Sequence, residues 1–241
     1  MRTAAPRPPP AEQQEPDRAG LLQSLGRLVR GLSTVFWLLP LSLIAQIETT
    51  RIDWFGSLGA WSGAPAVVLY CVLLYGLAQL RHFQKQERIW QDALARATFL
   101  GVVNAGLTPF IFWWRRFPDV SYFLLTVGLL VVSTFVFLMQ LNRVLVRLAA
   151  MIPDETLRAE TNIFAGINIW VLAGVLLALC AWTAAWVWAG SEASTQRLLM
   201  TLRWRASGVI LFLAIVPLAL TMALIWKIKE VLYAGIFSHQ A

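Results

Sequence analysis

Six long segments of this chain contain no Asp, Glu, Lys, Arg or His and are mostly apolar. They cover residues 31–47, 56–80, 98–114, 120–141, 163–189 and 207–226. About 20 helical residues span the hydrocarbon core of a bilayer, with a range of roughly 17–25. Inside that core every backbone N–H and C=O must be bonded internally, which a helix achieves locally. The six segments are therefore predicted to be transmembrane helices.

The composition favours a membrane protein over a soluble domain. Of the 241 residues, 58% are hydrophobic and 14% are charged, whereas soluble domains carry about 25% charged residues. Continuous apolar runs also argue against the alternating strands of a membrane barrel. The predicted fold class is all-α, a polytopic bundle of about six transmembrane helices within residues 29–229. The Pro-rich segment 1–28 is predicted to be a disordered cytoplasmic tail, and 230–241 a short cytoplasmic tail.

The distribution of Lys and Arg predicts the orientation of the chain. With both termini inside, 14 of the 20 Lys and Arg residues lie in inner segments, as the positive-inside rule requires. The main exception is the pair Arg115–Arg116, which a re-entrant third segment would move to the inner side. This asymmetry accounts for the net charge of +7, so we expect a lipid bilayer and no nucleic acid as partner. Richness in Ala, Leu, Arg and Trp favours a bacterial cytoplasmic membrane.

Similar residues recur at matching places in the predicted helices. The sequence LAQLR at 77–81 resembles LMQLNR at 138–143, and 224–229 is a looser third copy. Asn104 and Asn168 occupy matching places in the third and fifth segments. Such recurrence indicates a bundle of three helical hairpins, although apolar helices also resemble one another by chance.

Two inner connections also have helical features. Phe83, Trp90, Leu94 and Ala97 recur at helical spacing among Arg and Gln residues. This pattern predicts either a helix in the membrane interface or one that continues into the membrane. The sequence Pro-Asp-Glu at 153–155 predicts a helix start, since proline and acids are favoured in the first turn.

The apolar segments contain no set of residues with catalytic or metal-binding spacing. The two histidines, His82 and His239, lie outside them, and a catalytic triad or a metal site in the membrane would need such ligands. We therefore predict no catalytic residue, no metal ligand and no cofactor.

A substrate site is predicted only if the chain is a transporter. Segments 31–47 and 98–114 are short and interrupted by proline, a pattern typical of transporter binding sites. The candidate substrate residues are then Asn104, Gly106, Thr108 and Pro109. The alternative explanation of these residues is a structural kink in a packed bundle.

Small and amide side chains are candidates for helix packing, because small residues permit close approach and amides hydrogen-bond across helices. These residues are Gly59, Gly63, Gly101, Ala105, Asn168, Ala181 and Ala185. The two cysteines, Cys71 and Cys180, are expected to be small buried hydrophobes.

Three classes of function fit these observations. The first is a non-enzymatic membrane component that binds a membrane protein partner or a second copy of itself. The second is a small transporter or channel with its site at the kinked first and third helices. The third is a lipid-acting enzyme, which would have to use the outer acids Glu48, Asp53 and Asp119 or cytoplasmic groups.

Overall fold

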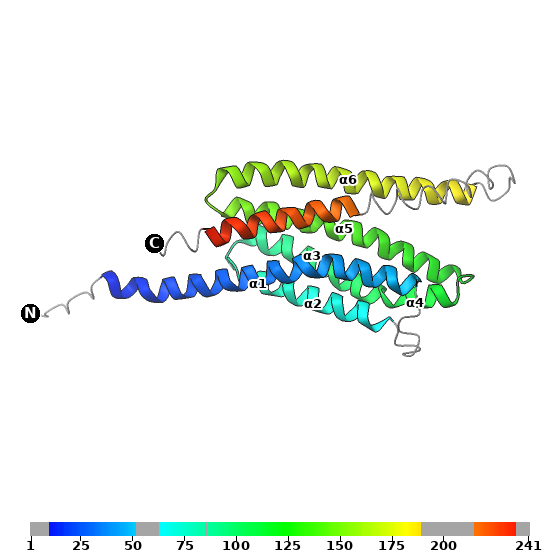
Figure 1. Ribbon diagram of the computed structural model, residues 1–241, viewed down its shortest axis with the longest axis horizontal. Coiled ribbons are helices and arrows are strands. Elements are labelled where there is room, and N and C mark those ends of the chain that lie inside the picture. The colour runs from blue at the N-terminus through cyan, green and yellow to red at the C-terminus, as the bar shows by residue number, and fades with distance from the viewer. Residues whose placement is uncertain (1–9, 52–62, 85, 189–214, 235–241) are drawn as a thin grey trace, which may run out of the picture.

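The computed structural model describes residues 10–51, 63–84, 86–188 and 215–234 (Figure 1). Its labelled helices are α1 (Pro10–Arg51), α2 (Ala64–Leu80), α3 (Arg88–Leu107), α4 (Pro109–Arg116), α5 (Ser121–Met151) and α6 (Glu155–Trp188). A further helix, here the C-terminal helix, covers residues 215–234. No strand occurs in these described ranges, so the predicted all-α class is confirmed.

α3 and α4 follow one path, and apart from this pair successive helices run in alternating directions along one bundle (Figure 1). α1 packs on α2, α2 on α3, and α5 on both α3 and α6. As a result, α1 begins and the C-terminal helix ends at the same end of the bundle. Most described basic residues gather there, and we call it the basic end: Arg27, Arg30, Arg81, Arg88, Arg96, Arg143, Arg147, Arg158, Lys227 and Lys229.

Four described segments are long and apolar enough to cross a membrane. They are Gln23–Thr49, Arg88–Arg116, Ser121–Met151 and Glu155–Ala185. α2 has 17 residues, and the first part of its predicted span, 56–62, lies outside the described residues. Residues 207–214 of the last predicted span lie outside them as well. Membrane character is thus supported by four helices.

The beginning of α1 differs from the sequence prediction. The helix starts at Pro10, inside the segment predicted to be disordered, and projects beyond the other helices at the basic end (Figure 1). Proline is well tolerated in a first turn, and the Ala, Glu, Gln, Arg and Leu residues that follow have high helix propensity. The prediction of a disordered segment, which was based on composition, did not take these helix propensities into account.

The third predicted span does not turn back. α3 ends at Leu107 and α4 begins at Pro109, yet Thr108 between them keeps helical φ and ψ of −54° and −41°. Pro109 has no N–H to donate, which interrupts the hydrogen-bond ladder without reversing the chain. The two helices therefore form one path to the end opposite the basic end, and the re-entrant alternative is wrong.

The connection before α3 continues into the bundle. α3 starts at Arg88, and its residues Trp90, Leu94 and Ala97 are fully buried. They join a core that includes Leu77 on α2 and Leu145 on α5. Of the two alternatives, the structure thus has a helix that continues into the membrane segment.

The cysteines are exposed, contrary to the expectation that they are buried. For a helix in lipid, both the outer surface and the core are apolar surroundings. The type of residue therefore does not determine which face it occupies.

The start of α6 gives a pH-dependent prediction. Asp154 Oδ1 accepts hydrogen bonds from Thr156 Oγ1 at 2.6 Å, Thr156 N at 2.9 Å and Leu157 N at 3.1 Å. The bonds from the Thr156 side chain and the Leu157 N–H lower the pKa of the Asp154 carboxyl. The cap therefore stabilises the fold above the ordinary aspartate pKa of about 3.9 and is lost as pH falls through the lowered folded-state value.

We expect Asp154→Ala to lower the melting temperature at neutral pH and to match the wild type in strong acid. Asp154→Asn, which caps without titrating, is the control. A melting difference between Asp154→Ala and wild type that stays constant with pH would contradict this role.

Candidate functional site

The four candidate substrate residues do not converge on one face. Asn104 and Thr108 are buried, and both Thr108 N and Thr108 Oγ1 donate to the Asn104 carbonyl, at 2.9 and 2.7 Å. Pro109 is half-buried, whereas Gly106 is exposed with open space around it. The candidate transport site is thus reduced to the buried pair Asn104 and Thr108.

Asn104 stands out because its amide is buried without a partner. Its side chain is fully buried, and neither Nδ2 nor Oδ1 has a hydrogen-bond partner among the described residues. An unpaired buried amide is unfavourable by roughly 1–3 kcal/mol on protein scales. A buried amide of this kind either lowers stability or serves to bind a polar group.

Asn168 differs from Asn104 because its side-chain nitrogen is hydrogen-bonded, although its Oδ1 has no partner among the described residues. It belongs to what we call the asparagine cluster: Asn142, Asn168, Thr221 and the Pro217 carbonyl. Asn168 Nδ2 donates to Thr221 Oγ1 at 2.9 Å, and to Asn142 Oδ1 and the Pro217 carbonyl, each at 3.1 Å. Asn142 Nδ2 donates to the Leu138 carbonyl at 2.8 Å and to Thr221 Oγ1 at 3.1 Å. All three side chains are fully buried. The cluster joins α5, α6 and the C-terminal helix.

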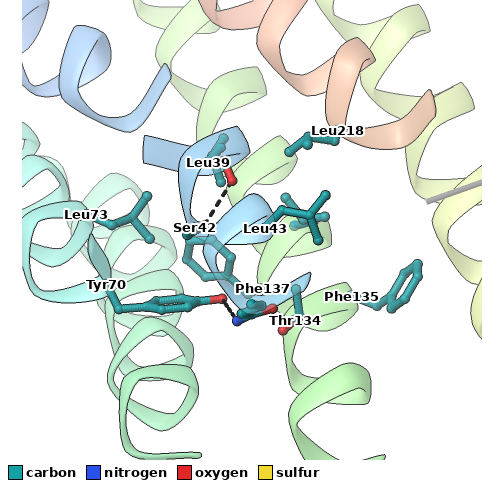
Figure 2. Close-up of a pocket in the computed structure, with 11 residues that line it drawn as sticks. Leu39, Ser42, Leu43, Tyr70, Leu73, Thr134, Phe135, Phe137 and Leu218 are labelled. Atoms are coloured by element: carbon teal, nitrogen blue, oxygen red, sulfur yellow. Dashed lines mark hydrogen bonds between the residues drawn. The ribbon is translucent and has the colours of Figure 1, made fainter. Parts of the chain in front are cut away.

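A small cavity lies between α1, α2, α5 and the C-terminal helix (Figure 2). Its polar lining consists of Ser42, Gln46, Tyr70 and Thr134, and the other lining residues are apolar. Figure 2 shows Tyr70 reaching from α2 toward α1, where Gln46 Nε2 donates to its hydroxyl at 2.9 Å. Ser42 and Thr134 donate to carbonyls of their own helices.

The size of this cavity limits what it can hold. Its volume is about 70 Å³, whereas sites for small organic ligands are usually about 300–1,000 Å³. A water needs roughly 10–15 Å³ of such volume together with polar partners. The cavity is thus suited to a few water molecules and is too small for an organic solute.

The candidate packing residues have different surroundings. A Cβ on Gly101 would lie 2.8 Å from Leu74 Cδ2, and one on Gly63 would be in ordinary contact with α4. Ala105 packs against the core, while Ala181 and Ala185 are exposed. Gly59 lies outside the described residues.

A close contact between two helix backbones lies at a pair that the sequence analysis missed. A Cβ on Gly31 of α1 would lie 2.8 Å from the Gly76 carbonyl of α2. The missed signal is a glycine near the basic end of each of the first two apolar segments, 31–47 and 56–80. Ser42 and Gln46 lie four residues apart on α1 and both line the cavity. This helical spacing of two polar residues is a second signal that the sequence analysis missed.

The outer acids do not form a described cluster. Glu48 is half-buried near the end of α1 and Asp119 is exposed after α4, while Asp53 lies outside the described residues. In the part of the chain that the structure describes, no three His, Cys, Asp or Glu residues are grouped as metal ligands.

Polar side chains meet at the basic end of each hairpin. Gln79 lines a groove with Arg27 and Arg30, and Gln140 lines another with Arg96. In the third hairpin, Lys227 forms an ion pair with Glu160. The basic end therefore combines a closed ion pair with two open, positively charged grooves.

Comparison with known proteins finds no matching family model, no similar curated protein and no similar solved structure.

Proposed function

We propose that this protein is a non-enzymatic integral membrane component that binds a protein partner at its basic end. The chain would sit in a bacterial cytoplasmic membrane with six spans, and with the basic end and both termini in the cytoplasm. The observation that carries the proposal is the exposed Ile89 at the basic end. The asparagine cluster supports the non-enzymatic part, because its polar groups bond to neighbouring helices. Amides used in this way hold a bundle together.

The basic end supplies the surface for a partner. Ile89 is 56% exposed on the first turn of α3, and its sequence neighbours are polar except for the buried Trp90. It lies outside the apolar segments, where an exposed large apolar side chain is less favourable than in lipid. A protein partner that covers Ile89 and pairs with the neighbouring charges would remove that exposure. Aliphatic anchors within a polar rim are common at protein interfaces.

Co-purification with matched variants tests this proposal. The chain is tagged at its C-terminus, extracted in a mild lipid-preserving detergent, and analysed for proteins that elute at fixed stoichiometry. We expect Ile89→Asp to reduce the partner's recovery at least tenfold. Gln86→Asp, which adds the same charge at another exposed inner position, should leave recovery within about twofold.

Equal recovery with Ile89→Asp, or no protein at fixed stoichiometry, would refute the partner surface. A chain that elutes as a defined oligomer of itself would replace the protein partner by a second copy. If both variants melt at the wild-type temperature, misfolding is excluded as the cause of a reduced recovery.

The unpaired amide of Asn104 favours a second candidate, transport of a small polar solute or ion past the helix interruption at Thr108 and Pro109. In proteoliposomes with a potential-sensitive or pH-sensitive dye, Asn104→Leu should then abolish a flux that the wild type supports. Flux that survives this substitution would remove Asn104 from any transport mechanism.

A further inference from the structure

An open polar groove lies at the basic end between α1 and the end of α2. It has a volume of about 460 Å³ and is lined by Gln23, Arg27, Arg30, Gln79 and His82. None of these residues is acidic. Among the described residues, neither Arg27 nor Arg30 forms an ion pair. Two guanidinium groups thus border one groove whose described lining contains no acidic side chain.

Comparison with the other two hairpins shows how the lining of this groove differs in its charges. At the matching place in the third hairpin, Glu160 of α6 neutralises Lys227 of the C-terminal helix. In the second hairpin, Arg96 and Gln140 border a mainly apolar groove with a single cation. The groove of the first hairpin is lined by two arginines, two glutamines and His82, and by no acid. This groove is therefore the described place best suited to an external anion.

The depth of the groove indicates where that anion comes from. Arg30 immediately precedes the uncharged stretch 31–47, and His82 follows the stretch that ends at Leu80. One residue deeper than Arg30, α1 meets α2 at the Gly31–Gly76 contact, which keeps the two helices close below the groove. The groove thus opens where hydrocarbon gives way to lipid headgroups.

We propose that this groove binds the phosphate of an anionic phospholipid. Arg27 and Arg30 would donate paired N–H groups to the phosphate oxygens, a geometry that guanidinium matches better than ammonium. The side-chain amides of Gln23 and Gln79 can donate further hydrogen bonds, and the acyl chains would lie along the apolar helices. The site is independent of the proposed protein partner.

Native mass spectrometry of the full chain in a neutral detergent tests the proposal. The probes are phosphatidylglycerol, phosphatidylcholine and inorganic phosphate. We expect the wild type to bind one phosphatidylglycerol in preference to phosphatidylcholine. If each arginine that contacts the phosphate contributes about fivefold, the double variant Arg27→Gln/Arg30→Gln should weaken this binding about 25-fold.

The matched control is Arg143→Gln/Arg147→Gln, which removes two exposed arginines from the same end but not from the groove. It should change binding less than twofold, and Arg27→Lys/Arg30→Lys should retain part of it. An equal loss in the control would show general attraction to anionic lipid and overturn the proposal. Unchanged binding by the double glutamine variant would overturn it as well.

Inorganic phosphate distinguishes the two sources of the anion. If millimolar phosphate neither binds the wild type in an arginine-dependent way nor displaces phosphatidylglycerol, the lipid assignment is supported. If it does both, the groove remains a phosphate site but its ligand comes from solution, and the lipid assignment is wrong. Melting temperatures without ligand should agree among all variants, since the substituted arginines are at least partly exposed.

Discussion

Replacing Asn168 by leucine is expected to destabilise the bundle by about 1–3 kcal/mol. The substitution removes the donor shared by Asn142 Oδ1, Thr221 Oγ1 and the Pro217 carbonyl, all within 3.1 Å. A lost hydrogen bond between membrane helices accounts for roughly 0.6–1.7 kcal/mol. The side-chain oxygen Asn142 Oδ1 also stays buried without this donor, which adds to the loss. The free energy of unfolding in mixed micelles with increasing SDS measures the effect.

Asn104→Leu is the matched control for this experiment. Both asparagines are fully buried, but the Asn104 amide has no partner among the described residues. Leucine there should leave stability unchanged or raise it by about 1 kcal/mol, since an unsatisfied amide is removed. If Asn104→Leu destabilises as much as Asn168→Leu, the unpaired state of Asn104 is wrong. A more stable variant that loses activity would instead identify Asn104 as a functional group kept at the expense of stability.

These two residues show how far the sequence could predict the site. Asn104 and Asn168 follow similar neighbours and occupy matching places in two apolar segments. The sequence alone therefore cannot distinguish their surroundings. The partners of Asn168 lie 26, 49 and 53 residues away along the chain. Such contacts depend on how the helices pack, and the spacing within one helix carries no information about them.

The fold was more predictable than the site. A long stretch without charged residues predicts a helix, because in a bilayer the backbone must bond all its N–H and C=O groups internally. The helix predicted from the spacing of Phe83, Trp90, Leu94 and Ala97 is present from Arg88 onward, so it includes the last three residues and not Phe83. By contrast, Ala181, Ala185 and the two cysteines are exposed. Lipid and protein core are both apolar, so hydrophobicity cannot indicate which face of a membrane helix is packed.

Gly31→Ala is expected to separate α1 from α2 and to destabilise the protein by about 1–3 kcal/mol, in the range of overpacked cores. The new Cβ would lie 2.8 Å from the Gly76 carbonyl oxygen and 3.1 Å from Gln79 Cβ. A backbone atom cannot rotate away as a side chain can, so the helices themselves must shift. SDS unfolding measures the loss, and Gly128→Ala is the control because nothing lies within 4 Å of its Cβ position. That control should be neutral or stabilising, since alanine is the better helix former.

The same substitution connects stability to the lipid site. Gln79 and Arg30 border the groove from opposite helices, and the Gly31–Gly76 contact sets the distance between those helices at this level. Gly31→Ala should therefore weaken phosphatidylglycerol binding although no lining residue is changed, whereas Gly128→Ala should not. Wild-type affinity in a destabilised Gly31→Ala protein would mean that the arginines bind lipid as independent surface charges. Loss of both stability and affinity would show that close packing of α1 and α2 organises the groove.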